Sequence, residues 1–513
     1  MKTLTRSLIL LSFVLACQSE TDVPDQNLPF QGIEIVLGEK LKNPYSVAVM
    51  RQAKENIIAR QPKTGSFART IADLDIRTTT LYVRYRPLDY EQYDDLQNTS
   101  PSELYSYPLD YEMVIEGDYY HDPTIPPDQP TWQYTAIEVG QPIPSNVTYE
   151  ILDELYLPED DYEILENGQI TEVWQPIVYE LEDEALQLTG NGYERVTSIA
   201  KSQRGSWRPS GKIMLFDNSL DAEVPVVGAK VNARRWFTTH TGITDANGNF
   251  SVDGTFRRPA NYSIKWERDD WDIRSGTWGQ AFFNGPKKEG SWDLVISSGA
   301  SRMYAVVHAA LNDYYHGNRL GLKSPPKNSF FKAKIKVAVF EKDKETDQGV
   351  VLGRHQKDWR LITLIPRLWI WDAARPCDEI YGTTIHELAH ASHWELRKNN
   401  WSDNNTEEKV KESWARGVQW ALTRLRYPNY PGGNTNRPSY TQVVVDMIDG
   451  PSATDQNFGS ERLNEDNVSG YTIKEIEDAL IGQGSWNGWR DNIKIKYANA
   501  TEDNLDALFA HWN

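Results

Sequence analysis

Apolar side chains recur at helical spacing through the second half of the chain. Within residues 303–314, Val306, Val307 and Ala310 fall on one face, as in an amphipathic helix. The same kind of pattern predicts further helices over residues 384–398, 406–426 and 472–481. Apolar and β-branched runs predict strands over residues 334–340 and 361–371. The second half is therefore expected to place strands before a pair of consecutive helices, with residues 361–371 offering an edge for an extended peptide.

The middle of the chain changes to short apolar runs separated by turn residues. These runs predict strands over residues 213–216, 227–233 and 262–266. Between the last two, Asn247-Gly248 can supply the positive φ angles of a hairpin turn over residues 244–250. Short strands with such turns are typical of a small β-structure rather than a helical one.

Two motifs in this region carry a family resemblance. V-P-V-V-G-A-K-V at residues 224–231 and T-D-A-N-G-N-F at residues 244–250 resemble the small β-sandwich of the carboxypeptidase-regulatory family. The resemblance implies a spacer or interaction module over residues 206–275. Asp245 and its alternating neighbours also resemble a calcium loop, but the bidentate acid that closes such a loop is missing, so turn chemistry is the better interpretation.

The first part of the chain is acidic. From Pro87 to Glu194 there are 26 Asp and Glu and no Lys or Arg, so the formal charge of −19 leaves +7 for the rest of the chain. Residues 78–85 predict a strand, and residues 149–165 predict an acidic helix broken at Pro158. We expect an acidic α+β domain over residues 18–205 that lies against, or shields, the more basic remainder.

Composition bounds the class of protein. With 513 residues, 39% hydrophobic residues and 25% charged residues, the chain is typical of a globular protein of several domains. Its strongly negative charge argues against nucleic acid as a partner, because binding phosphates needs basic patches. Beyond the N-terminal leader, no segment approaches the 18 or so consecutive apolar residues of a transmembrane helix.

The N-terminus has the organisation of a secretory leader. Lys2 and Arg6 precede an apolar run at residues 8–15, which is too short for a stable membrane span. The run ends in Val-Leu-Ala-Cys17, which resembles the lipobox of bacterial lipoproteins. That resemblance implies cleavage before Cys17 and lipid attachment to it, with palmitate-type chains anchoring the protein in the cell envelope, at the outer membrane and facing the periplasm or the exterior. Cys377 would then lack a partner within the chain and is interpreted as a buried thiol rather than a thiolate near a metal.

His386-Glu387-Leu388-Ala389-His390 carries the clearest chemistry. The two His are four residues apart, so on a helix they lie one turn apart on the same face and can share one Zn²⁺. Glu387 beside them can deprotonate a metal-bound water, as the catalytic base of a metal-dependent hydrolase. Thr383 and Thr384 are candidate N-caps for this helix.

The third ligand has more than one candidate. A metzincin would need a His six residues after His390, where the chain has Leu396. His393 lies on the same face as His386, but seven residues separate the two by about 10.5 Å along the axis, so it is expected in the second shell or at the substrate. Glu412 follows on the next predicted helix.

Here the chain resembles the gluzincin metallopeptidases. H-E-L-A-H and the following Glu412-Ser-Trp-Ala carry the resemblance, which implies that His386, His390 and Glu412 hold zinc. Gluzincins often have an Asp four residues after the ligand Glu, and this chain has Arg416 there. Asp446 is the candidate substitute. Tyr440 and His355 are candidates for stabilising the oxyanion.

Together these features predict a multidomain α+β protein. We expect a leader over residues 1–17, the acidic domain over 18–205, the β-sandwich over 206–275 and a mainly helical, zincin-like metallopeptidase domain over 290–513. The predicted function is zinc-dependent hydrolysis of peptide or protein substrates at the membrane, most simply as an endopeptidase. The alternative is a non-enzymatic surface lipoprotein that binds peptide or glycan and keeps a structural or vestigial metal site.

Overall fold

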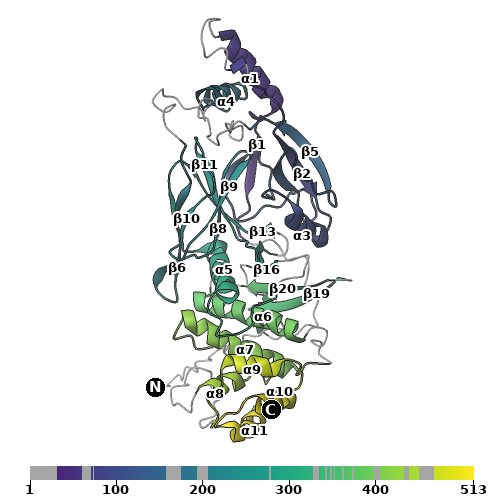
Figure 1. The fold of residues 1–513 in the computed structure, drawn as a ribbon, viewed down its shortest axis with the longest axis vertical. Helices are drawn as coiled ribbons and strands as arrows, with labels where there is room; N and C mark the ends of the chain where they lie inside the picture. The colour runs from purple at the N-terminus through teal and green to yellow at the C-terminus, as the bar shows by residue number, and fades with distance from the viewer. Residues whose placement is uncertain are drawn as a thin grey trace, which may run out of the picture.

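A computed structural model describes the fold over residues 32–60, 71–72, 74–157, 175–192, 206–276, 279–326, 334–340, 344–346, 349–351, 353–360, 363–371, 375–397, 405–432, 438–449 and 467–512. The leader and Cys17 lie outside these ranges. The chain is a mixed α+β protein of elongated shape, with α1 and α4 at one end, sheets in the middle and C-terminal helices at the other end (Figure 1). None of the helices in the described ranges combines the length and the apolar character needed to cross a lipid bilayer.

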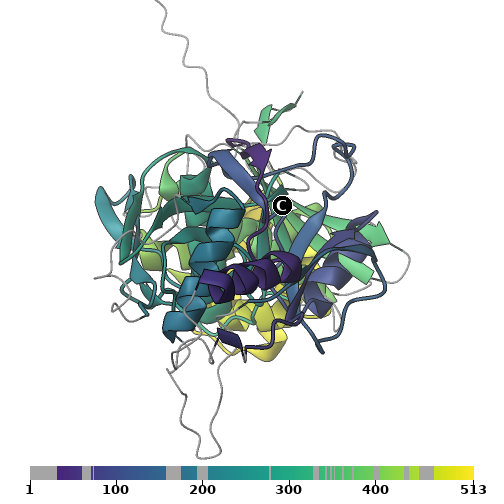
Figure 2. The same cartoon turned by 90° about the horizontal axis from the view of Figure 1, so that it is seen from above.

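The N-terminal part combines small sheets with three helices in its described ranges. Antiparallel strands form a ribbon of β1 (Val36–Lys40) with β3 (Tyr111–Ile115), and a sheet in which β2 (Thr80–Arg86) lies between β4 (Gln133–Glu138) and β5 (Thr148–Leu155). The helices are α1 (Val47–Arg60), α3 (Tyr90–Thr99) and α4 (Gln175–Leu188). Helices α1 and α4 pack side by side at the tip of the molecule (Figure 2).

One prediction in this part is wrong. Residues 148–155 form strand β5 rather than the start of an acidic helix. Tyr149 and Ile151 lie on a strand paired with β2, and most of β5 is exposed because it is the outer strand of its sheet. The acidic residues therefore reflect a solvated sheet edge, where charge discourages pairing with another chain.

The middle part consists of two sheets that share one core. The first has the order β10 (Asn249–Ser251), β6 (Ser210–Asp217), β15 (Trp292–Ile296), with β7 (Ala222–Pro225) also on β6. The second has the order β14 (Phe282–Lys288), β11 (Ala260–Lys265), β8 (Lys230–Arg235), β9 (Thr238–Ile243). Tyr262 from the second sheet packs on Trp292 from the first, with ring centroids 5.3 Å apart.

The turn at residues 244–250 joins these two sheets instead of closing a hairpin. Gly248 adopts φ +79° and Asp245 accepts hydrogen bonds from the N–H groups of Asn247 and Asn249, as turn chemistry requires. However, β9 pairs with β8 and β10 pairs with β6. The local signal at Asn-Gly gives the turn correctly, but strand pairing across the core decides its partners.

A third sheet lies between the middle part and the helices. Its order is β13 (Gly279–Gln280), β12 (Trp271–Ser275), β16 (Ile335–Phe340), β20 (Thr363–Trp371), β19 (Gly353–Arg360). Strands β12, β16 and β20 are parallel and β19 is antiparallel to β20. The predicted strand at residues 361–371 is therefore interior, and the outer strand is β19. A short hairpin of β17 (Lys344–Thr346) and β18 (Gly349–Val351) precedes it.

The chain interleaves the second and third sheets. Strand β12 leaves the middle part to join β16, and β14 and β15 then return to complete the middle part. Strands β12 and β13 therefore lie in another sheet than β11 and β14, which precede and follow them along the chain. Sequence patterns mark each strand but not the sheet that it joins, because sheet pairing is decided by distant partners.

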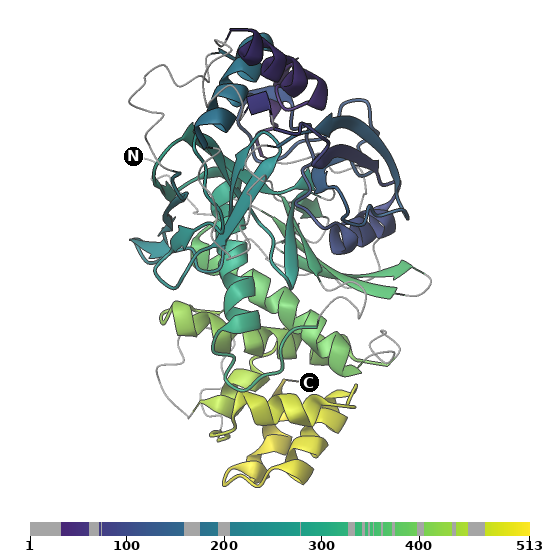
Figure 3. The same cartoon turned by 45° about the horizontal axis from the view of Figure 1, so that its top comes forward.

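The helices of the C-terminal half run from the sheets, where α5 lies, to the far end of the molecule, which the last helices form (Figure 1 and Figure 3). They are α5 (Gly299–His316), α6 (Cys377–Arg397), α7 (Glu408–Arg426), α8 (Val443–Ile448), α9 (Ile473–Leu480), α10 (Trp486–Lys496), the short 3₁₀ helix η5 (Glu502–Asn504) and α11 (Leu505–His511). Helix α6 packs against both α5 and α7 and lies under β19 and β20. The helices predicted at residues 303–314, 406–426 and 472–481 are confirmed, the last with a capping box at Thr472.

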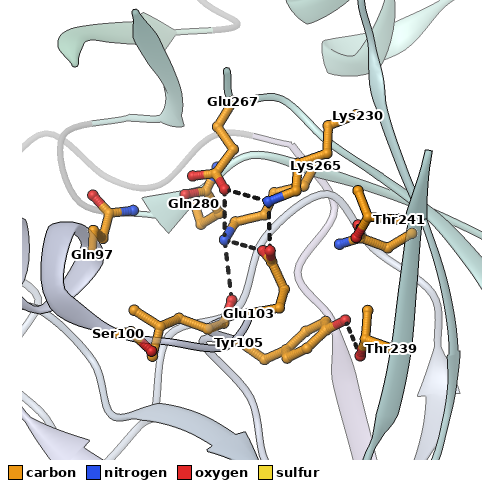
Figure 4. A network of polar contacts seen from close by, with 12 residues as sticks. Gln97, Ser100, Glu103, Tyr105, Lys230, Thr239, Thr241, Lys265, Glu267 and Gln280 are labelled. Carbon is orange, nitrogen blue, oxygen red and sulfur yellow. Dashed lines mark hydrogen bonds and ion pairs between the residues drawn. The ribbon is translucent and has the colours of Figure 1, made fainter. Parts of the chain in front are cut away.

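Buried ion pairs attach the acidic part to the rest. Glu103, just after α3, pairs with Lys230 on β8 and Lys265 on β11, and both lysines also pair with Glu267 (Figure 4). Asp94 on α3 pairs with Lys336 on β16 at 3.0 Å. Removing one partner of such a pair leaves an uncompensated buried charge, so these contacts fix where the acidic part docks.

Glu182 on α4 makes a second buried cluster. Its carboxylate accepts hydrogen bonds from Tyr45, from Arg235 at 2.8 Å and from Arg258 at 2.6 Å. Burial alone would raise the pKa of Glu182, but the two guanidinium groups outweigh burial and bring the pKa to about 2. The carboxylate is thus ionised in the folded protein at all ordinary pH values.

Glu182→Gln should therefore destabilise the protein by about 3–5 kcal/mol at neutral pH, because it removes the charge of the carboxylate that the buried Arg235 and Arg258 share, although Asp183 still pairs with Arg258. The folded pKa of about 2 lies below the unfolded value of about 4.3, so wild type keeps this stabilisation above about pH 4.3 and loses it as pH falls toward 2. Urea unfolding of both proteins across pH measures the gap. Glu150→Gln, which breaks the exposed Glu150–Arg84 pair, is the control at about 0–1 kcal/mol. The account would be contradicted if both variants lost the same free energy of unfolding relative to wild type, or if the loss in Glu182→Gln grew as the pH fell.

Candidate metal centre

Helix α6 begins earlier than its apolar pattern indicates. Its first N–H groups are capped by the loop after β6: Cys377 N donates to Asn218 Oδ1 at 2.9 Å, and Asp378 N donates to Ser219 Oγ at 3.0 Å. Thr384 lies inside the helix, with its hydroxyl donating to Ile380 O, so Thr383 and Thr384 are not N-caps. The cap comes from a segment about 160 residues away along the chain, which local sequence patterns cannot reveal.

Helix α6 is buried on nearly all sides. Ile385, Leu388 and Ala389 belong to the large core that also contains the apolar residues of α5 and α7. Tyr381 Oη donates to Asp313 Oδ2 on α5 at 2.9 Å, which fixes the rotation of α6 about its axis. Cys377 is buried at the start of α6, and burial raises the pKa of its thiol. This agrees with a buried thiol.

Three buried ligand-type side chains meet between α6 and α7. One donor atom each from His386, His390 and Glu412 lies within 4.8 Å of the others. The Nε2 atoms of the two imidazoles are 3.1 Å apart, and Glu412 Oε2 is 3.3 Å from His386 Nε2 and 3.2 Å from His390 Nε2. The structure therefore brings together the three residues that the sequence pattern selects as ligands.

The electrostatics of the cluster favour a cation. Burial would raise the pKa of Glu412, but the imidazoles of His390 and His386 outweigh it and hold the pKa well below its ordinary value. Burial lowers the pKa of His390, whereas the Glu412 carboxylate raises it more strongly. With Glu412 5% exposed, its ionised form needs a positive partner in place. Two imidazole nitrogens and one carboxylate oxygen are a donor set that suits zinc.

Gln419 holds the His386 ring from behind. The Nδ1 atom of His386 lies 3.1 Å from Gln419 Oε1, and Gln419 Nε2 donates to Tyr430 Oη at 2.7 Å. An Nδ1–H that donates to this amide leaves Nε2 of His386 directed at His390 and Glu412. Gly382 makes room for the arrangement, since a Cβ there would lie 2.5 Å from Tyr430 Oη.

Gln419 is not among the candidates that the sequence pattern offers. That pattern has Arg416 where gluzincins often have an Asp, and it offers Asp446 as the substitute. Asp446 Oδ2 instead accepts a hydrogen bond from Trp512 Nε1 at 2.7 Å. A signal was present: Gln419 is seven residues after Glu412 and so lies on the same face of α7, two turns further on.

Tyr440 is held beside the centre by α7. Arg416 donates to Tyr440 O, and Ser413 Oγ accepts from Thr441 N at 3.2 Å. The Tyr440 ring is nearly parallel to the His386 ring, 11° apart with centroids 6.1 Å apart. Arg416, which replaces the expected Asp, thus positions this loop.

The remaining candidate residues are Glu387, His393 and His355. Glu387 is fully buried next to His386, and its charge raises the pKa of His390. His393 is also fully buried, and burial together with His390 lowers its pKa well below the ordinary value. A buried, neutral ring is suited to packing rather than to contact with a substrate. His355 lies on the outer strand β19.

Comparisons of this chain with protein-family models, with curated proteins and with solved structures give no match in any of the three. The chemistry of the centre therefore rests on the residues described above.

Gln419→Ala should weaken zinc binding about 10–100-fold, because the His386 ring loses the acceptor that fixes its orientation. Competition with a chromophoric chelator measures the zinc Kd directly and needs no substrate. Gln483→Ala, well away from the centre in sequence and half-buried, is the control and should bind zinc like wild type. An unchanged Kd in Gln419→Ala would show that the amide does not support the ligand.

Proposed function

We propose that this protein is a zinc-dependent peptidase anchored to the membrane by an N-terminal lipid. The observation that carries the proposal is the convergence of His386, His390 and Glu412 within 4.8 Å in a buried position, with Glu387 adjoining the first His. A structural site usually closes with four protein ligands, whereas three leave a position for water. Among the described residues, this is the cluster that offers such a ligand set.

The surrounding architecture supports the same proposal. The sheet with β19 at its outer edge lies over α6, so an extended peptide could pair with that strand close to the ligand helix. We assign the third sheet and helices α5–α11 to a zincin-like metallopeptidase domain of the gluzincin type. The two sheets of the middle part are assigned to a carboxypeptidase-regulatory-like sandwich.

Different residues of the centre have different roles in the proposed hydrolysis. A zinc ion on the two His and Glu412 would supply a Lewis acid that polarises the scissile carbonyl and acidifies water. Glu387 takes the proton of the attacking water and delivers it to the leaving amine, so the peptide bond is replaced by a carboxylate and an amine. Tyr440, beside His386, is the proposed donor to the oxyanion. Gln419 orients His386.

Three variants separate these roles. Glu387→Gln should reduce hydrolysis at least about 10²–10⁴-fold while zinc stays near one ion per chain, because the amide cannot accept the water's proton. Glu412→Ala should lose zinc and activity together, because it removes a ligand. His393→Ala should keep zinc. The measurements are metal content of the purified protein and cleavage of a mixed peptide library, followed by mass spectrometry.

Thermal unfolding of each variant controls for damage to the fold, which matters for the fully buried His393. Zinc and activity retained in Glu412→Ala, together with loss of both in His393→Ala, would overturn the ligand assignment. Zinc binding without cleavage of any library peptide would favour a binding lipoprotein with a structural metal.

The lipid anchor is tested separately, since Cys17 lies outside the described residues. Changing Cys17 to Ser should block incorporation of radiolabelled palmitate in a bacterial host and move the protein out of the membrane fraction, because the thiol that carries the lipid is gone. Cys377→Ser is the matched control and should leave labelling unchanged. Wild type that takes up no label would refute the anchor.

A further inference from the structure

The sheet β14-β11-β8-β9 has one apolar and one polar face. Val231 and Ile264 point into the shared core. The alternate positions carry polar side chains in register: Arg234 on β8 is opposite Asn261 on β11, and Ser263 on β11 is opposite Asn284 on β14. Because successive side chains of a strand point to opposite faces, these four lie on the outer face. That face is turned toward the acidic N-terminal part.

A cavity of about 290 Å³ lies between the polar face and the N-terminal part. Arg234, Asn261, Ser263 and Asn284 line one side, and Tyr107 lies on the other. It is made by residues from both parts of the chain and is separate from the metal centre, which lies on α6 and α7. A volume at the lower end of the usual range for ligand sites fits a small molecule rather than a long chain.

Arg234 is the unusual residue of this cavity. It is 9% exposed, and it donates from Nη1 to Trp236 O at 2.6 Å. Its guanidinium lies over the rings of Tyr105 and Tyr107, at 5.3 and 5.9 Å from their centroids. Within the described part of the chain, no carboxylate comes within ion-pairing distance of it.

The neighbouring buried cations each pair with a carboxylate in the described structure, unlike Arg234. Arg235 pairs with Glu182, and Lys230 and Lys265 pair with Glu103 and Glu267. The acidic residues that line the same cavity, Glu112 and Glu116, are exposed at its rim, as is Lys287. The buried Arg234 guanidinium has aromatic and carbonyl contacts but no carboxylate partner among the described residues. It can therefore bind an anionic ligand, since Arg presents several donors in a planar fork.

We propose that this cavity binds a small ligand through a carboxylate held by Arg234. Asn261 and Ser263 offer an amide and a hydroxyl to the polar part of the ligand, and the Tyr107 ring offers an apolar wall. The carboxylate could belong to an amino-acid derivative or to an acidic monosaccharide, which share this chemistry. The site would add a ligand-binding function that is independent of hydrolysis.

Isothermal titration of the mature protein with three probes tests the ligand class. The probes are N-acetylphenylalanine, its neutral amide, and galacturonate. At least one carboxylate probe should bind saturably, and the amide should bind at least about tenfold more weakly than N-acetylphenylalanine if the amino-acid source is right, since a hydrogen bond to a charged group is worth about that much. Preference for galacturonate would assign the sugar-acid source. No saturable binding of either carboxylate at millimolar concentration, or saturable binding of the amide as tight as that of N-acetylphenylalanine, would overturn the proposal.

Variants then locate the site. Arg234→Gln should lose about tenfold or more in affinity for the bound carboxylate, and Arg234→Lys should lose less, because it keeps the charge but not the fork. Arg257→Gln is the matched control, since its guanidinium lies over Tyr179 at 5.3 Å and outside this cavity. Glu412→Ala should bind the probe like wild type. Unchanged affinity in Arg234→Gln would refute the site. If that variant does not fold, the comparison of acid with amide on wild type still decides.

Discussion

The arrangement of the C-terminal half depends on burying one carboxylate between two imidazoles. An ionised carboxylate away from water costs several kcal/mol unless a cation or several donors compensate it. Glu412 is in that position, with both imidazole Nε2 atoms within 3.3 Å of its Oε2 atom. A metal ion would bind the carboxylate and both imidazoles at once. The packing around α6 and α7 holds these three groups close together. Helix α6 is capped by the loop after β6, hydrogen-bonded to α5 and covered by β19 and β20.

The supporting contacts come from α7 and the segments that follow it. Gln419 and Tyr430 orient His386, and Arg416 with Ser413 positions Tyr440 beside it. Each of these residues lies on α7 or in the segments that follow it, so one helix supplies both a ligand and the groups that align the others. This explains why α7 is buried along most of its length despite carrying several charged residues. The interleaved strands then join the centre to the middle part and, through buried ion pairs, to the acidic part.

The pair of His can be predicted from the sequence because its signal is local: residues i and i+4 share a helix face wherever the helix packs. Glu412 lies on the next predicted helix, and its role as a ligand is what the resemblance to the gluzincins implies. Features that depend on distant partners were predicted wrongly or missed. The cap of α6 comes from Asn218 and Ser219, and the residues of β5 resemble an acidic helix in sequence because an exposed acidic strand lacks an apolar face. Beyond its spacing from Glu412, Gln419 gives no signal of its own in the sequence, because an amide that orients a ligand looks like any other polar residue on a helix face.

The central claim is that His386, His390 and Glu412 hold one zinc ion. Anomalous diffraction from crystals grown with zinc, recorded above and below the zinc absorption edge, tests it most directly. The account predicts one anomalous peak at the point shared by the Nε2 atoms of both imidazoles and the Glu412 carboxylate, with Gln419 Oε1 still in contact with Nδ1 of His386. A zinc peak elsewhere, for example at Cys377, would contradict it. So would well-ordered side chains of His386, His390 and Glu412 with no zinc peak between them.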